Sequence, residues 1–187
     1  MKRQYIHGIK WLAVSVGYGL VFSTVAHQDD HHQSALSQQE QQEQKQMFEC
    51  HISTPAKVKL GEAIPMAFKL TNVSEHSLNV LKWNTPFEGW FNDYLNITVD
   101  GKRVNYNGAM VKRFRPSEDD YSMIKPGQSK HATVNLAEGY DLSSKGVYSL
   151  SYSGRLHDVK VINGDKPAGK APMLYSLQCN DLSFIIE

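Results

Sequence analysis

Apolar residues recur at every second position in several short stretches after about residue 56. This period of two is the signature of a half-buried β-strand. The stretches 64–70, 129–136 and 146–152 show it most clearly, with polar or small residues between the apolar ones. In the first of them, the apolar face would hold Ile64, Met66, Phe68 and Leu70.

Turn residues separate these stretches at regular spacing. Asp100-Gly101 is a strong hairpin signal and Pro126-Gly127 is typical of a type II turn. No stretch of the folded part repeats its apolar residues with a helical period, so we predict an all-β, immunoglobulin-like antiparallel β-sandwich. The region 154–172 is expected to form either an extended hairpin or a loop. Further strands are predicted at 56–60, 78–83, 94–99, 103–106, 109–112, 121–124, 174–179 and 182–186.

The N-terminal part of the chain differs from the rest in composition. Residues 1–26 read as a secretory signal peptide, with a basic start, an apolar centre and small residues before a cleavage site after Ala26. The alternative is an uncleaved membrane anchor, but the apolar run is shorter than the roughly 20 residues that span a bilayer. Residues 27–47 form a Gln-rich linker, disordered or partly helical, and 48–187 the β-sandwich domain.

The net charge of the chain after removal of its leader limits the kinds of partner that it can bind. The whole sequence has a net charge of +1, and its leader contributes Lys2, Arg3 and Lys10 without any acidic residue. The exported part is therefore weakly acidic, which argues against binding to a nucleic-acid backbone. We expect a secreted or periplasmic protein with a protein partner, no nucleic acid and no stable membrane insertion once the signal is removed.

Two cysteines lie near the two ends of the predicted folded part, at Cys50 and Cys179. An even number of cysteines in an exported chain favours a disulfide. The alternative is a pair of buried free thiols. We predict that the disulfide joins the first and last strands.

The stretch 80–91 begins as a strand and then breaks. Pro86 removes a main-chain donor, and Gly89 permits a sharp turn before Trp90 and Phe91. We assign Trp83 to the core and leave two interpretations open for Trp90 and Phe91, as core residues or as exposed anchors. The predicted partner-binding residues are Asn84, Thr85, Pro86, Phe87, Glu88, Trp90 and Phe91, with the acidic turn 118–121 as the next candidate.

Motifs of catalysis are not found in the sequence. It contains no H-E-x-x-H, G-x-S-x-G, C-x-x-C or phosphate-binding loop. We therefore predict no catalytic residue, no metal site and no cofactor, hence no enzyme. Two weaker metal hypotheses stay open. His27, His31 and His32 of the linker could bind a metal ion, although a solvated tether is the simpler interpretation. The acidic run 118–120 could bind a cation, although a solvated loop that opens with a short helical turn is the simpler interpretation.

A series of short motifs between about residues 61 and 152 resembles a known family. It comprises Leu70-Thr71-Asn72-Val73-Ser74, 80–89, Asp100-Gly101-Lys102, Tyr106-Asn107-Gly108, Val111-Lys112-Arg113, Pro116, 118–121, 126–129, Tyr140-Asp141-Leu142 and Gly146-Val147-Tyr148. Together they resemble the N-terminal pro-region of bacterial deuterolysin-like (peptidyl-Lys) zinc metalloendopeptidases. In that family a catalytic domain with a zinc-binding H-E-x-x-H helix and an Asp ligand follows, and this sequence contains neither.

The resemblance implies a protease-binding module without protease activity. A pro-region assists the folding of its protease and holds it inactive. The chain is thus expected to act as a free-standing inhibitor or folding helper of a secreted zinc metalloprotease. The alternative is a secreted β-sandwich binding or adhesion module unrelated to proteolysis, because a fold does not fix a function.

Overall fold

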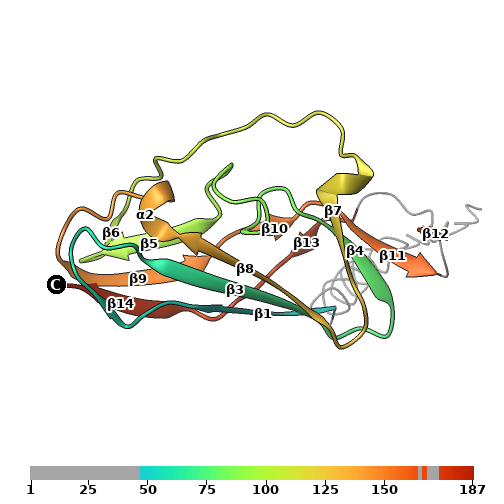
Figure 1. Cartoon of the computed structure of the whole chain (residues 1–187), viewed down its shortest axis with the longest axis horizontal. Coiled ribbons are helices and arrows are strands. Elements are labelled where there is room, and N and C mark those ends of the chain that lie inside the picture. Colours follow the sequence, from blue (N-terminus) through green and yellow to red (C-terminus); the bar gives the residue numbers. More distant parts are fainter. Residues whose placement is uncertain (1–46, 164–165, 168–172) are drawn as a thin grey trace, which may run out of the picture. The chain divides into compact units, whose positions relative to one another are not determined.

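The computed structural model describes residues 47–163, 166–167 and 173–187. The predicted signal peptide and residues 27–46 of the predicted linker lie outside the described residues. Nearly all the regular secondary structure of the described part is β-strand (Figure 1), which confirms the predicted all-β class.

The first sheet has three antiparallel strands in the order β1-β3-β8. In the central strand, Met66, Phe68 and Leu70 are fully buried and alternate with more exposed positions. The predicted apolar face is thereby confirmed, and Ile64 just before the strand is buried as well. The strands are β1 (Phe48–Ser53), β3 (Pro65–Asn72) and β8 (Ser129–Asn135).

The second sheet has five strands in the order β2-β14-β9-β5-β6. All its pairings are antiparallel except that between β2 and β14. Tyr148, Leu150 and Tyr152 are buried along β9, while Val147 points to solvent, as the alternation predicted. The strands are β2 (Lys57–Val58), β14 (Leu182–Ile186), β9 (Gly146–Tyr152), β5 (Leu95–Val99) and β6 (Lys102–Arg103).

The buried faces of these two sheets share one core. Phe68 of β3 stacks on Tyr152 of β9 with their ring centroids 5.5 Å apart, so the contact joins the two sheets. Cys50 of β1 is bonded to Cys179, just before β14. The predicted disulfide is therefore confirmed, and two sheets joined through one core form the predicted sandwich.

A third sheet extends the core, with the order β12-β11-β4-β7. Leu78 and Val80 of β4 are fully buried. The pair β11-β12 falls within 154–172, so the hairpin alternative is the correct one for that part of the region. These strands are β4 (Ser77–Leu81), β7 (Tyr121–Ile124), β11 (Val159–Asn163) and β12 (Lys166–Pro167), and a separate pair is formed by β10 (Arg155–Leu156) and β13 (Tyr175–Ser176).

Two short helices complete the described part. The 3₁₀ helix η1 (Glu118–Asp120) is the helical turn expected after Ser117. The helix α2 (Leu136–Gly139) was not predicted; the Asn135 side-chain oxygen caps it by accepting from Ala137 N–H at 3.3 Å. The same oxygen accepts from Ile64 N–H at 2.9 Å, which fixes the start of β3 to the end of β8.

The predicted strand at 109–112 is wrong. Residues 109–117 form neither strand nor helix, and all of them are exposed. The sequence has a strand-like composition here, but no neighbouring strand pairs with it and no core receives its side chains. In Figure 1 this stretch is part of the long yellow-green to yellow run between β6 and the short helix before β7.

Candidate partner-binding site

The corner between β4 and β5 is built by a compact turn over residues 82–91. The Thr85 hydroxyl donates to Lys82 C=O at 2.6 Å and accepts from Phe87 N–H at 3.2 Å. Thr85 itself is fully buried. Asn84 and Gly89 have positive φ angles of 59° and 87°, which glycine and, among other residues, asparagine adopt most readily. The chain therefore reverses here through specific local hydrogen bonds.

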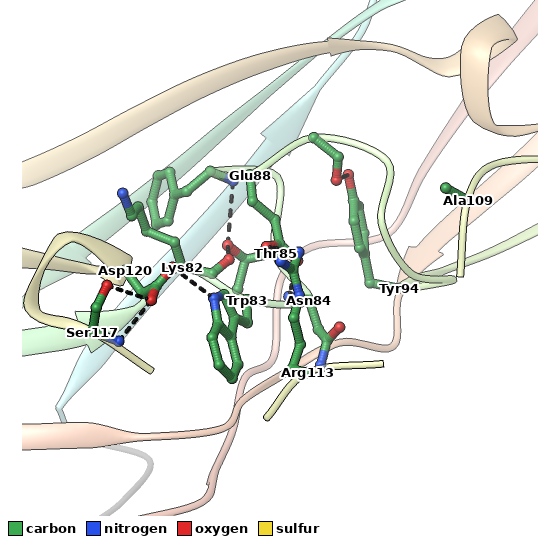
Figure 2. A network of polar contacts seen from close by, with 12 residues as sticks. Lys82, Trp83, Asn84, Thr85, Glu88, Tyr94, Ala109, Arg113, Ser117 and Asp120 are labelled. Atoms are coloured by element: carbon green, nitrogen blue, oxygen red, sulfur yellow. Dashed lines mark hydrogen bonds and ion pairs between the residues drawn. The ribbon is translucent and has the colours of Figure 1, made fainter. Parts of the chain in front are cut away.

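Glu88 connects this corner to the exposed stretch after Gly108. Its carboxylate accepts from Asn84 N–H at 2.6 Å and from the Arg113 guanidinium at 2.6 Å (Figure 2). The side chains of the pair keep only 11% and 29% of their surface exposed. A partly buried, charge-assisted contact of this kind is stronger than an exposed one, so Glu88 and Arg113 fix the corner and the stretch to each other.

On the other side of the corner, Trp83 contacts the acidic turn. Its indole N–H donates to the Asp120 carboxylate at 2.9 Å, and Ser117 donates both its main-chain N–H and its hydroxyl to the same carboxylate (Figure 2). The Ser117 bonds first, and then the Trp83 bond, lower the pKa of Asp120 to about 2. Asp120 is therefore a structural anion that orients Trp83.

Trp90 lies in an aromatic cluster packed against the core. It stacks on Tyr94 at 5.0 Å between centroids, meets Tyr140 edge-on at 5.4 Å, and donates its indole N–H to Asn135 C=O at 2.9 Å. It also lies against Gly139, where a Cβ atom would come within 2.6 Å of the ring. The core interpretation of Trp90 is thus the one that the packing supports.

Tyr140 and Tyr94 complete the support of the corner. Tyr140 donates its hydroxyl to Asp93 at 2.6 Å, and its oxygen accepts from Leu95 N–H at 3.1 Å. Burial, and then the hydrogen bond to Asp93, raise the pKa of Tyr140. Burial likewise raises the pKa of Tyr94. Both phenols therefore stay neutral, as packed and hydrogen-bonded supports.

Trp83 is not the core residue that its position in a strand-like stretch suggested. It is half-buried and does not belong to the core cluster or to the residues packed against it. It lies in the wall of a groove of about 590 Å³, together with Asn84, Met110 and Arg113. The Arg113 guanidinium carbon lies 5.3 Å from its ring centroid. The structural reason is that β4 ends at Leu81, so the alternation no longer places the next side chains in the core.

The predicted partner-binding residues therefore divide into two groups. Thr85 and Pro86 are buried, and Phe87 meets Phe68 edge-on at 5.2 Å, so these three, like Trp90, hold the corner rather than presenting surface. Of the other members, Asn84 lies in the groove wall and Phe91 has 41% of its surface exposed, whereas the mostly buried Glu88 side chain serves as the link to Arg113.

The exposed stretch beside the corner was missed as a candidate site. Its residues 109–116 carry Lys112, Arg113 and Arg115 and no acidic residue, and Met110 and Phe114 project into solvent. The sequence did contain a signal of a candidate site here, namely a run that combines three cationic residues with large apolar residues and ends at Pro116. Its location next to Phe91 depends on the fold.

The described residues lack two further features, a metal-binding cluster and a membrane-spanning helix. No group of three or more His, Cys, Asp or Glu side chains is arranged there to hold a metal ion. The acidic run 118–120 belongs to this part, whereas His27, His31 and His32 lie outside it. Among the helices of the described part, none has the length and apolar character needed to cross a membrane.

Taken together, the fold and the corner define a β-sandwich domain that presents one fixed, partly apolar and basic surface. No family model matches the chain. It is, however, 37% identical over 107 residues to a protein named "Extracellular protease" from Aeromonas hydrophila, an alignment that covers 55% of this chain and 31% of that protein.

Two fungal proteins show the same kind of similarity. A "Neutral protease 2 homolog" from Uncinocarpus reesii is 35% identical over 89 residues, covering 46% of this chain and 24% of that protein. "Neutral protease 2 homolog MEP5" from Coccidioides posadasii is 32% identical over 105 residues, covering 54% and 28%. The chain thus spans a quarter to a third of the length of these relatives, and about half of it is a protease-related region. Together with the disulfide, the name of the Aeromonas protein agrees with a secreted protein.

Proposed function

We propose that this domain is a protease-binding module: a non-catalytic, pro-region-like domain that binds a secreted zinc metalloendopeptidase and holds it inactive. The observation that carries the proposal is the similarity to proteins named proteases, over 107 residues in the Aeromonas protein. The alignment makes up only 31% of that protein, a share that suits an accessory region better than a whole enzyme. The motifs at 80–89 and 111–113, which resemble a protease pro-region, contribute residues to the surface described above.

The geometry of the corner supports a role in protein contact. Phe91 is exposed, and its ring lies 5.3 Å from the Arg113 guanidinium carbon, which holds it in place. The hydrogen bonds of Thr85 and the ion pair of Glu88 fix the turn before any partner arrives. A surface that is ordered in advance loses less conformational entropy on binding. Aromatic residues and arginine are also the residue types that dominate binding energy at interfaces.

Within the corner, Phe91 is proposed as the principal contact residue, with Asn84 in the groove wall as a second contact and Glu88 orienting Arg113. Trp90 is proposed to act through the shape of the corner only, because its ring packs on Tyr94 and Gly139. Phe91→Ala should therefore weaken binding by about 2 kcal/mol, the scale of an interface hot spot, and leave the free energy of unfolding nearly unchanged.

The experiment combines the purified domain with the extracellular protease isolated from culture medium of Aeromonas hydrophila. We expect binding by calorimetry and a loss of peptide hydrolysis that depends on the amount of domain added. The domain alone, supplied with zinc, should hydrolyse no peptide. Hydrolysis by the pure domain would contradict the non-catalytic role, and absence of binding would favour the alternative of a binding or adhesion module unrelated to proteolysis.

A further inference from the structure

The exposed stretch 109–116, here called the basic segment, has an unusual conformation for so apolar a sequence. It contains no helix, strand or turn, yet Met110 and Phe114 leave 71% and 90% of their surface in solvent. Arg115 places its guanidinium carbon 5.3 Å from the Phe114 ring centroid, on the solvent side of the segment. Large apolar side chains held outward in this way are typical of residues that await a partner.

The basic segment is attached to the domain mainly at its middle. Val111 N–H donates to Phe91 C=O at 3.3 Å, and among the described residues this is the only main-chain hydrogen bond of 110–116. Arg113 supplies the second attachment, through its ion pair with Glu88 and its contacts with the Trp83 and Phe91 rings. At the start of the segment, Ala109 C=O accepts from the Tyr106 hydroxyl at 2.9 Å. The other main-chain N–H and C=O groups of 110–116 are left for another molecule.

Extended peptides with free main-chain groups are recognised in a particular way. A cleft pairs with the main chain as an added strand would, and pockets receive side chains that alternate along the peptide. The basic segment offers both elements, because its main chain is open and Met110 and Phe114, four positions apart, project outward. The segment carries three cationic side chains and no acidic one, which also favours a cleft with a negative electrostatic potential.

We propose that the basic segment enters the substrate cleft of the bound protease in an extended, substrate-like conformation, with Met110 and Phe114 as the side chains that fill its pockets. This rests on the proposed function, and it specifies that inhibition arises from occupation of the cleft itself. The corner then lies at the edge of the cleft, where Phe91 makes its own contact with the protease and Arg113 holds the segment to the corner. The alternative is binding to a surface of the protease remote from the cleft.

The first test separates these two binding modes. The Aeromonas hydrophila extracellular protease is saturated with a small competitive inhibitor that fills its substrate cleft, and binding of the intact domain is then measured. We expect the apparent affinity to fall about tenfold or more, and inhibition of peptide hydrolysis to be competitive. Unchanged binding to the filled protease, or purely non-competitive inhibition, would overturn the inference while leaving the proposed function intact.

The second test uses variants of the segment. Met110→Ala with Phe114→Ala should raise the inhibition constant at least about tenfold, since each truncated contact residue of this class costs a factor of several to ten. The matched control is Val147→Ala with Met123→Ala, two residues of β9 and β7 that are 56% and 57% exposed. Thermal unfolding should be the same for both double variants and for the unaltered domain.

The outcomes are distinguishable from a failure of the proposed function. If the unaltered domain does not bind the protease at all, the proposed function fails and the inference fails with it. If the unaltered domain and both double variants inhibit equally well, only the inference is overturned. If the control variant loses inhibition while the segment variant keeps it, the contact surface lies on β7 or β9, and the basic segment is not the inserted element.

Discussion

The sharpest prediction on stability concerns Trp90 and its contact with Gly139. Trp90→Ala removes a ring that stacks on Tyr94, meets Tyr140 edge-on and donates to Asn135 C=O. Gly139→Ala perturbs the same contact from the opposite side, because its Cβ would lie 2.6 Å and 2.7 Å from two carbons of the Trp90 ring. Gly139 does not have a positive φ angle, so an alanine at this position would be strained only by the contact of its Cβ with the indole ring of Trp90.

The magnitude follows from what each change removes or inserts. Truncation of a packed tryptophan costs about 3–5 kcal/mol, through the lost burial, the cavity and the unpaired carbonyl. For a domain of this size the melting temperature should fall by about 10–20 °C. Gly139→Ala inserts one methyl group against a rigid ring and should cost about 1–3 kcal/mol.

The assay is urea unfolding of the single and double variants, followed by circular dichroism. In the Trp90→Ala background the added methyl of Gly139→Ala meets no ring, so its cost should vanish and the double-mutant cycle should show clear coupling. Trp83→Ala serves as the comparison, because Trp83, half-buried like Trp90, does not pack against the core. It should cost about 1 kcal/mol, the usual size for a point substitution.

Two results would refute this reasoning. The first is a loss of less than about 1 kcal/mol for Trp90→Ala, a value within the range of surface substitutions. The second is strict additivity of Trp90→Ala and Gly139→Ala, which would mean that the two residues do not touch in solution. A larger loss for Trp83→Ala than for Trp90→Ala would restore the assignment made from the sequence.

Two further predictions concern the whole domain and its response to acid. Replacing Cys50 and Cys179 together by serine should lower the free energy of unfolding by about 2–5 kcal/mol, since the bond closes a loop over a sequence separation of 129 residues; equal denaturant midpoints for the oxidised and serine forms would contradict this. Hydrogen bonds lower the pKa of Asp120 in the folded protein to about 2 from its ordinary value of 3.8. Its stabilising effect should therefore be complete above about pH 4 and be lost as the pH falls toward 2. Asp120→Asn should flatten that part of an acid-unfolding profile, and an unchanged profile would show that the Ser117 and Trp83 bonds do not form.

The strands with strict alternation could be predicted from the sequence. In 64–70 and 146–152 one face is wholly apolar, and shifting such a strand by one residue would expose that entire face. The hairpin turn could be predicted as well, because Asp100 and Gly101 adopt positive φ angles of 50° and 74° that few other residue pairs tolerate. The disulfide needed only the count of cysteines in a chain that reads as exported, since two cysteines allow a single intramolecular pairing.

The roles of the corner residues required the tertiary structure. Trp83 and Trp90 are the same residue type seven positions apart, and local pattern alone cannot tell which one packs against the core. Trp90 does so because Tyr140 and Gly139 approach it from α2 and its end, about 50 positions away in the chain.

The stretch 109–116 is a second case in which local sequence does not decide the structure. Its composition suits a strand, but a strand needs a partner along its main chain and a face to bury against. The described fold supplies neither to this stretch, and its position is fixed by the hydrogen bond of Ala109 C=O to Tyr106 and by the contacts of Val111 and Arg113 with the corner. The sequence by itself thus determined the elements whose stability depends on local period and turn chemistry. The surface at the corner was decided by contacts between distant parts of the chain, because burial is a property of the assembled fold and not of any one segment.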